Sequence, residues 1–307
     1  MPYLLLTLAA IFWGGNYVIG HVLVSHANPL LLSEFRWLLT ALLLMALYHS
    51  SVRKDWNNIK SSLPVIFFLA IFGQVLFPLT LYVGLQYTNS LNAAIYMSAT
   101  PCMVLCINRF VFKDHISRRN CLGVAASTVG VIFLILQGNL FNLSALSNLN
   151  KGDLWAMGSA LSWALYCSFL RLKNRTISGN SFVAVSSVIG AVIIFPVALY
   201  GFLHDPHFAA TWYLNAGFLS GLVYLVIFPS WLSYVFWNRG IQEIGATQGE
   251  IFTHIIPLSG GLLSIAFLGT QLHYYHLVSA ILISAGIWLC SGHKKLRISY
   301  TPTTPSS

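Results

Sequence analysis

The chain has 307 residues, of which 57% are hydrophobic and only 7% are charged. A soluble domain carries about 25% charged residues, so this composition excludes a soluble enzyme, a nucleic-acid-binding module and a disordered protein. The 16 Lys and Arg residues outnumber 7 acidic ones, and in a membrane protein such an excess orients the chain. We therefore expect an all-α integral membrane protein.

Ten segments are long and apolar enough to cross a bilayer as a helix, which takes about 20 residues. The first has no basic region or cleavage site before it, so we expect a retained helix rather than a signal peptide. Between the fifth and sixth, residues 138–151 are predicted to form an extracytoplasmic linker, and residues 292–307 a disordered cytoplasmic tail. The predicted spans are 3–24, 29–49, 63–86, 89–112, 119–137, 153–171, 180–203, 213–238, 245–268 and 273–291.

The basic residues give this topology a direction. With the N-terminus in the cytoplasm, Lys151 falls in an outer loop and Arg36 inside a span, and the other 14 basic residues all fall in inner loops or the tail. The positive-inside rule predicts this asymmetry for cytoplasmic loops. We therefore predict that both termini are cytoplasmic.

The chain also shows signs of an internal duplication. A shift of 156 positions brings identical residues together at Gly84/Gly240, Gln86/Gln242, Ile95/Ile251, Pro101/Pro257 and Gly130/Gly286. We therefore predict two five-helix repeats, 1–137 and 152–291. Because five is odd, the second repeat would be inverted, an architecture typical of secondary transporters with a site near the midplane. The alternative is that any two polytopic segments align to some extent by chance.

Particular segments resemble a known family. They are the run Gly245–Pro257 (GATQGEIFTHIIP), the run Leu268–Leu272 (LGTQL), the opening Ala9–Val18 (AAIFWGGNYV) and the segment around Arg36. Together they look like an EamA-type transporter of the drug/metabolite transporter superfamily, over nearly the whole chain. The resemblance implies ten duplicated helices and export of amino acids and other small metabolites, without ATP, across the bacterial inner membrane.

One position departs from the family pattern. The family often carries a Glu after the Leu-Gly that closes helices four and nine, where this chain has Asp114 and Thr270. The second change weakens any role for that carboxylate in the second repeat. The family also usually has an Arg at the position of Arg36, which favours a structural or gating role for this residue.

Ionisable groups inside a bilayer are costly and mark functional sites. Glu250 and His254 are four residues apart and hence on one helix face. Pro257 follows on the next turn and leaves the Thr253 carbonyl without its helical donor. This group could bind a cationic amine or take up a proton, or it could be a structural pair that bonds neighbouring helices. Glu34 and Arg36 are two residues apart and cannot pair along their helix.

Aromatic side chains are predicted to line the cavity, which suits an organic solute. Those at duplicated helical positions are the strongest candidates, while Trp37, Trp56, Trp155, Trp212 and Tyr213 are expected to form an interfacial belt or ordinary packing. The predicted substrate-binding residues are Trp13, Asn16, Tyr82, Tyr96, Trp163, Tyr166, Trp231, Tyr234, Glu250 and His254. The predicted gating or hinge residues are Arg36, Pro101 and Pro257.

These patterns together predict a secondary active transporter, an exporter of metabolites such as amino acids, that works by alternating access. The expected partners are a small-molecule substrate, membrane lipid and protons as coupling ion, with no cofactor, bound metal or nucleic acid. The alternatives are a membrane-embedded enzyme, or a carrier of drugs, nucleotide-like solutes or divalent metals. The spacing of His273 and His276 could suit a metal, but no carboxylate joins them in a span.

Overall fold

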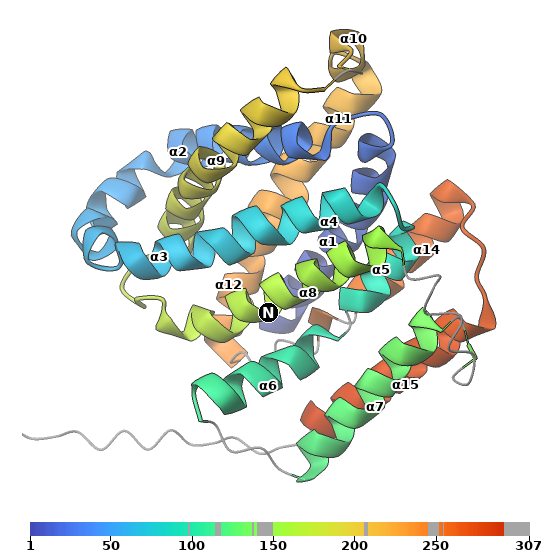
Figure 1. Cartoon of the computed structure of the whole chain (residues 1–307). Helices are drawn as coiled ribbons and strands as arrows, with labels where there is room; N and C mark the ends of the chain where they lie inside the picture. Colours follow the sequence, from blue (N-terminus) through green and yellow to red (C-terminus); the bar gives the residue numbers. More distant parts are fainter. Residues whose placement is uncertain are drawn as a thin grey trace, which may run out of the picture.

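The computed structural model describes residues 1–97, 99–113, 118–136, 138–139, 150–205, 208–244, 252–253 and 255–291. Over these residues every element is helical, so the predicted all-α class is confirmed there. In chain order the elements are α1 (Pro2–Val24), α2 (Pro29–Ser61), α3 (Leu63–Ala70), η1 (Ile71–Leu76), α4 (Phe77–Leu85), α5 (Ser90–Met97), α6 (Thr100–Val111), α7 (Arg118–Ile135), α8 (Lys151–Phe169), η3 (Leu170–Leu172), α9 (Gly179–Leu203), α10 (Ala210–Tyr213), α11 (Ala216–Leu225), η4 (Val226–Leu232), α12 (Ser233–Ile244), α14 (Ile255–Leu268) and α15 (Tyr274–Ser291) (Figure 1).

Six helical stretches in the described part of the chain are long and apolar enough to cross a membrane. This makes the chain a multi-pass membrane protein, while the count of ten spans stays a prediction. Three shorter apolar helices occur at Cys121–Gly130, Ile255–Leu268 and Tyr274–Gly286. The six long stretches are Pro2–Val24, Pro29–Ser61, Leu63–Leu85, Ser90–Val111, Gly179–Leu203 and Ala216–Glu243.

Helix α2 is longer than the predicted span, which ended at residue 49. The helix continues to Ser61 beyond a kink at Tyr48, whose φ of −121° and ψ of 15° are not helical. The residues after the kink include the charged run Arg53-Lys54-Asp55. Apolarity therefore marks where a span ends, whereas backbone hydrogen bonding lets the helix continue into water.

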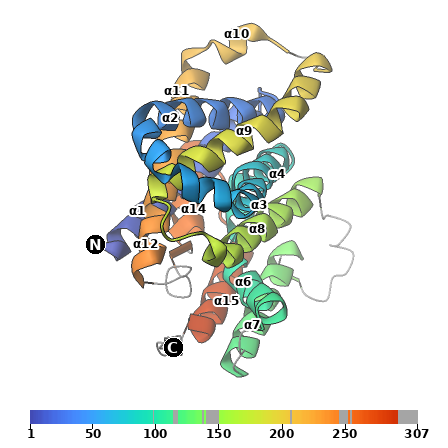
Figure 2. The same cartoon turned by 90° about the vertical axis from the view of Figure 1, so that its left-hand side faces the viewer.

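The helices pack as pairs around a central α1. Helices α2 and α9 lie side by side in both views, and α7 and α15 form a second pair at one edge of the molecule (Figures 1 and 2). Helix α1 contacts α4 and α5 as well as α11, η4, α12 and α14. The N-terminal helix is thus enclosed by elements from both halves of the chain.

Small residues allow α1 and α14 to approach closely. A Cβ placed on Gly14 would collide with the Ser259 hydroxyl and lie 2.8 Å from the Gly260 nitrogen, and one on Gly260 would lie 3.1 Å from the Gly14 carbonyl oxygen. Glycines at helix interfaces permit this backbone contact inside membranes. The contact fixes α1 against a helix of the second half.

Two π-helical segments interrupt the long helices of the two halves. Segment η1 covers Ile71–Leu76, and η4 covers Val226–Leu232. The shift of 156 positions found in the sequence carries residues 71–76 onto 227–232, inside η4. A π-turn leaves backbone carbonyls without their usual helical donors and often occurs at functional sites.

The paired prolines lie in the first turns of helical segments. Pro101 is the second residue of α6, after α5 has ended at Met97, and Pro257 is the third residue of α14. A proline is tolerated in the first turn of a helix, where its missing N–H would have no partner within the helix. Helix α5, which precedes the segment of Pro101, is in contact with α14.

Candidate functional site

Arg36 stands at the centre of the described structure. It lies on α2, eight residues into the helix counting from Pro29, and it is fully buried. Its Nε donates to the Ser230 hydroxyl at 2.5 Å, and its Nη1 donates to the Asn16 side-chain oxygen at 3.0 Å and to the Tyr82 hydroxyl at 2.6 Å. We call these four side chains the Arg36 cluster. They come from α2, α1, α4 and η4.

The bonds within the Arg36 cluster are all to neutral groups. Tyr82 in turn donates its hydroxyl hydrogen to Asn16 at 2.8 Å, which orients both side chains around the guanidinium. The guanidinium carbon also lies 5.2 Å from the centre of the Trp37 ring and 5.7 Å from that of Tyr82. No ion pair to Arg36 occurs within the described ranges, so its charge is balanced there by dipoles and ring faces alone.

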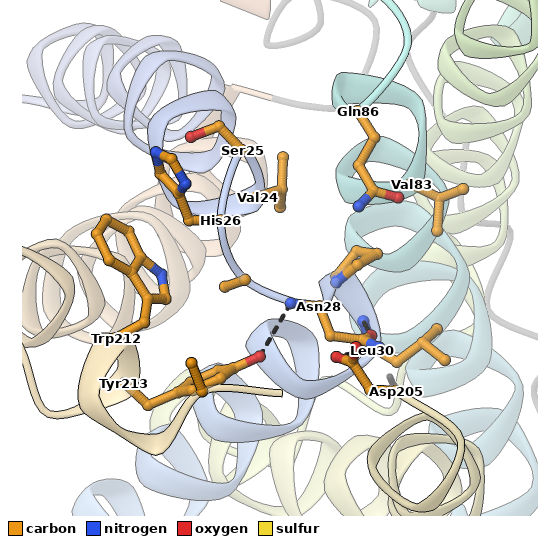
Figure 3. A pocket seen from close by; sticks show the side chains of 13 residues that line it. Val24, Ser25, His26, Asn28, Leu30, Val83, Gln86, Asp205, Trp212 and Tyr213 are labelled. Atoms are coloured by element: carbon orange, nitrogen blue, oxygen red, sulfur yellow. Dashed lines mark hydrogen bonds between the residues drawn. The ribbon is translucent and has the colours of Figure 1, made fainter. Parts of the chain in front are cut away.

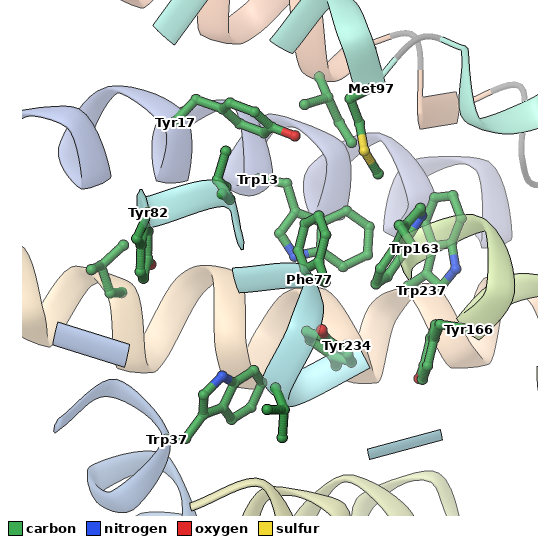
Figure 4. Close-up of a cluster of buried hydrophobic side chains, with 14 of the residues drawn as sticks. Trp13, Tyr17, Trp37, Phe77, Tyr82, Met97, Trp163, Tyr166, Tyr234 and Trp237 are labelled. Atoms are coloured by element: carbon green, nitrogen blue, oxygen red, sulfur yellow. The ribbon is translucent and has the colours of Figure 1, made fainter. Parts of the chain in front are cut away.

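Beside the Arg36 cluster lies a group of buried aromatic rings, here called the aromatic cluster (Figure 4). The centre of the Trp13 ring lies 4.9 Å from that of Trp163, 5.2 Å from that of Trp237 and 5.8 Å from that of Tyr234. Trp163 stacks on Tyr166 with 5.0 Å between ring centres. These edge and stacked geometries are the favoured ones for aromatic pairs.

The two π-segments are tied to the aromatic cluster by their free carbonyls. The Tyr234 hydroxyl donates to the Gly73 carbonyl oxygen at 2.6 Å, and the Trp13 indole N–H donates to the Pro229 carbonyl oxygen at 2.9 Å. Positions 73 and 229 are related by the shift of 156. At the same place in each half, therefore, an aromatic donor from the other half holds a π-segment carbonyl.

Several buried polar atoms near these clusters have no hydrogen-bond partner in the part of the chain that the structure describes. Leaving a buried donor unpaired costs about 1–3 kcal/mol, so each such atom in a folded protein calls for an explanation, such as a bound water, a ligand or strain. The atoms are Asn16 Nδ2, Arg36 Nη2, Trp37 Nε1, Trp163 Nε1 and Trp237 Nε1.

The structure gathers most of the predicted aromatic residues, with two exceptions. Tyr96 lies on α5 beside Asp153 at the start of α8, and Trp231 is half-buried with its ring 6.3 Å from that of Tyr48. Neither belongs to the aromatic cluster. The predicted residues that do meet are Trp13, Asn16, Tyr82, Trp163, Tyr166 and Tyr234. Glu250 and His254 lie outside the described residues.

Two residues of the site were missed by sequence reasoning. Trp237 belongs to the aromatic cluster, and its place three residues after Tyr234 on one helix face is a signal that could have found it. Trp37 is fully buried, with its ring 5.7 Å from that of Tyr234. The interfacial belt expected as one reading for Trp37 is therefore excluded, because a belt residue reaches the headgroups.

A pocket of about 740 Å³ opens at the end of the bundle where α1 turns into α2 (Figure 3). Asn28 organises it: the backbone N–H donates to the Tyr213 hydroxyl at 2.9 Å, and the side chain donates to the Asp205 carboxylate at 3.3 Å. Burial raises the pKa of the Tyr213 hydroxyl, as does the nearby Asp205 charge, so it stays a neutral phenol. His26 and Trp212 cover one wall with their rings 4.6 Å apart. We call this the Asn28 pocket.

At the opposite end, α2 is joined to the start of α9. The Ser51 hydroxyl lies 3.1 Å from that of Ser178 and 2.9 Å from that of Ser181, and the Ser178 N–H donates to the Asp55 carboxylate at 3.0 Å. Nearby, burial lowers the pKa of Lys173, although the Asp55 charge opposes this. We call these serines and Asp55 the Ser51 junction. It closes the contact between α2 and α9 at this end.

His273 and His276 serve the local fold. The His276 ring accepts the His273 backbone N–H at 3.1 Å, and its other nitrogen lies 3.0 Å from the Asn92 side-chain oxygen. Both ring nitrogens are therefore occupied. Among the described residues, no three potential metal ligands gather at one point.

Comparison with known proteins identifies the family. The sequence model of the EamA-like transporter family matches residues 1–136 and matches again at residues 150–292. The chain belongs to the EamA-like transporter family. The double match follows the two halves that carry η1 and η4.

The similarity to individual relatives extends over nearly the whole chain. It is 27% identical to the uncharacterized transporter YyaM of Bacillus subtilis, across 94% of this chain and 93% of the relative. It is 25% identical to a probable amino-acid metabolite efflux pump of Salmonella typhimurium, across 92% of each. A solved protein crystal structure shares the fold with a TM-score of 0.62 at 16% identity, covering 94% of this chain and 95% of the other.

Proposed function

We propose that this protein is a secondary active transporter of small organic metabolites, with its substrate site at the Arg36 and aromatic clusters. The observation that carries the proposal is the buried guanidinium of Arg36, held where α1, α2 and α4 of the first half meet η4 of the second. Buried charges inside a membrane are retained where they act on a substrate or an ion. The transporter names of the relatives agree with this.

Alternating access is supported by the relation between the two halves. The family matches both halves, and the π-segments fall at positions related by 156 residues. Two inverted five-helix repeats would produce this pattern, and rocking of one repeat against the other would expose a central site to each side in turn. The paired π-turns and the segments that begin at Pro101 and Pro257 are the proposed hinges.

The ends of the α2–α9 pair suggest the state that the structure represents. The Ser51 junction lies next to basic residues, and by the positive-inside rule this end faces the cytoplasm. The Asn28 pocket then faces outward. We propose an occluded molecule in which the inner end is closed, the Asn28 pocket opens outward and the central site lies buried below the pocket.

Amino acids and related metabolites are the proposed substrates, and export is the proposed direction. One relative is named a probable amino-acid metabolite efflux pump, and an aromatic wall beside a few polar groups suits such solutes. The protein would be purified, reconstituted into liposomes and assayed for uptake of labelled L-amino acids, nucleosides and cationic dyes. Uptake of amino acids above that of empty liposomes is expected. Uptake of none of these solutes would contradict the proposal.

Proton coupling is assigned to Glu250, which lies outside the described residues but is an intramembrane carboxylate by sequence. The variant Glu250→Gln should lose uptake driven by a pH gradient yet keep substrate exchange between compartments of equal pH, because exchange needs no net proton movement. Uptake would be measured with and without the gradient. An unchanged response to the gradient would remove Glu250 from coupling, and loss of both activities would point to a structural role.

A further inference from the structure

The charge of Arg36 has no counter-charge among the described residues. Seven residues separate it from Pro29 at the start of α2, so it lies about 10 Å inside the helix. It is fully buried, and its hydrogen bonds go to the neutral side chains of Ser230, Asn16 and Tyr82. Dipoles hold the guanidinium in place, but they do not neutralise it. An uncompensated buried charge is strongly unfavourable.

The free donor of Arg36 is at Nη2. This nitrogen is buried and has no partner within the described ranges, whereas Nε and Nη1 are both bonded. Asn16 Nδ2 is another unpartnered donor, and the oxygen of the same Asn16 amide accepts from Arg36. The two unused donors thus belong to directly bonded side chains, and an acceptor with negative charge is the group that bonds most strongly to such a donor pair.

The neighbouring carboxylate on α2 does not fill this place. Glu34 is buried, but it is two residues from Arg36 and so faces a different side of the helix. One of its carboxylate oxygens, Oε2, has no hydrogen-bond partner among the described residues.

We propose that Arg36 binds the carboxylate group of the transported solute through Nη2, with Asn16 Nδ2 as a second donor. This inference rests on the proposed transport function and names its substrate class as small organic carboxylates with an apolar or aromatic remainder. Ser230 and Tyr82 act as positioning residues, because they hold the other nitrogens of the guanidinium. The rings of the aromatic cluster contact the apolar part of the solute.

The Asn28 pocket gives the carboxylate an entrance. On α2 the pocket residue Pro29 lies seven positions before Arg36, and the pocket residue Gln86, directly after the end of α4, lies four positions after Tyr82. Both spacings keep the two members of each pair on one helix face. Along these two helices the Arg36 cluster therefore lies about one to two turns from the pocket.

A single carboxylate fits this site better than a phosphate. Of the basic side chains in the described structure, Arg36 and Lys173 are buried, and the Lys173 ammonium donates to the Ile177 carbonyl near the Ser51 junction. One cation balances a monoanion, whereas a phosphate would bring nearly two charges. The ring faces of Trp37 and Tyr82 leave the rest of the site apolar.

The test compares solutes that differ at the carboxylate alone. Uptake of L-leucine, L-leucinamide and isoamylamine, and of L-phenylalanine, L-phenylalaninamide and phenethylamine, would be measured in liposomes containing the full chain. The wild type should prefer each acid over its amide and amine by at least about 10-fold, as expected for a buried charged pair. The ratio of acid to amide does not depend on the fraction of active protein.

Variants of Arg36 test whether this residue causes the preference for acids over amides. Arg36→Gln should bring the ratio close to one, and Arg36→Lys should leave an intermediate ratio because it keeps the charge but loses the planar fork. Arg239→Gln is the matched control, since it removes an exposed arginine that pairs with Glu243 at 3.3 Å, and its ratio should equal that of the wild type. If Arg36→Gln does not fold, Ser230→Ala should lower the ratio by loosening the guanidinium.

Two results would overturn the assignment. One is equal uptake of acids, amides and amines by the wild type, which would leave transport intact but remove the carboxylate site. The other is an acid preference that survives in Arg36→Gln. If no solute is transported, the same acids and amides would be titrated against the tryptophan fluorescence of the purified protein. Acid-selective binding that requires Arg36 would then uphold the site while contradicting transport, and binding without this selectivity would contradict the site.

Discussion

In both π-segments a backbone carbonyl accepts a hydrogen bond from an aromatic side chain of the other half, but the two side chains differ. In the first half the Gly73 carbonyl is held by the Tyr234 hydroxyl, and in the second half the Pro229 carbonyl, 156 positions later, is held by the Trp13 indole. The donors come from different helices, α12 and α1, and no repeat relation connects them. The shared feature is therefore the open backbone position and its tie to the opposite half.

Hydroxyl groups within each helix complete the comparison. In the first half Thr80 donates to the Leu76 carbonyl at 2.6 Å, and in the second half Ser233 donates to the Phe228 carbonyl at 2.9 Å. Thr80 and Ser233 are not at equivalent positions. Each half thus contains a π-segment, and different hydroxyl groups bond to its carbonyls.

The largest effect is expected from truncating Trp13, which serves both the Pro229 carbonyl and the aromatic cluster. Trp13→Ala should lower the free energy of unfolding by about 3–5 kcal/mol, since it removes a large buried ring. Trp13→Phe keeps most of the ring packing and should cost about 1–3 kcal/mol for the unpaired carbonyl. Unfolding in mixed micelles with SDS would measure both. Trp56→Ala, at an exposed ring, is the control, and equal costs for Trp56→Ala and Trp13→Ala would contradict the central role.

A glycine in η1 is the next most sensitive position. A Cβ on Gly73 would lie 2.6 Å from Cδ2 of the Tyr166 ring, which is stacked on Trp163. Gly73→Ala should therefore cost about 1–3 kcal/mol by overpacking. Gly158→Ala on α8 is the matched control because nothing lies within 4 Å of its added Cβ, and it should stabilise the helix by up to about 1 kcal/mol. The same SDS titration would compare them, and a harmless Gly73→Ala would argue against a tight η1 contact.

Tyr234→Phe removes only the hydrogen bond between the Tyr234 hydroxyl and the Gly73 carbonyl in the first half. The ring stays in the aromatic cluster, and the Gly73 carbonyl loses its donor, so the cost should be about 1–2 kcal/mol. This value should agree with that of Trp13→Phe within about 1 kcal/mol if the two ties are equivalent. Tyr87→Phe, at an exposed ring, should have no measurable effect. A large difference between the Tyr234 and Trp13 variants would break the proposed equivalence of the halves.

The smallest effect is expected at Ser233. Its hydroxyl donates to the Phe228 carbonyl, with the Ala9 carbonyl a second acceptor at 3.2 Å. Ser233→Ala should cost about 0.5–1.5 kcal/mol, the usual net worth of a hydrogen bond. Ser220→Ala removes an exposed hydroxyl bonded to the Gly217 carbonyl in the same way and should be neutral. A cost at Ser220 equal to that at Ser233 would show that burial is unimportant here.

Helical spacing and duplication predicted part of the set of aromatic side chains that meet. Trp13 and Trp163 are related by a shift of 150 positions, and their rings are in contact, while Tyr82 and Tyr234 were both predicted to line the cavity and both lie in the clusters. These relations follow from periodicity, which the sequence displays directly. The all-helical class followed from composition for the same reason.

Other features depend on tertiary packing and left no local signal. A π-turn differs from an α-turn by one shifted hydrogen bond, and neither η1 nor η4 has a distinctive sequence; Pro229 lies inside one segment and Gly73 inside the other. The groups that accept hydrogen bonds from Arg36 come from three other segments of the chain, so its role in the site could not be read from α2 alone. The position of Tyr96 beside Asp153 likewise depends on the packing of α5 against α8.

The central claim, a carrier whose one site is exposed to each side in turn, is tested most directly by counterflow. Liposomes containing the protein would be loaded with unlabelled L-leucine or L-phenylalanine and diluted into a trace of the same labelled amino acid at equal pH. A carrier with alternating access takes up the label transiently above its equilibrium level, because outward movement of unlabelled substrate returns the site to the outside. We predict this overshoot in the wild type and its loss in Arg36→Gln. Uptake that rises smoothly to equilibrium and is unaffected by the internal amino acid would contradict the account.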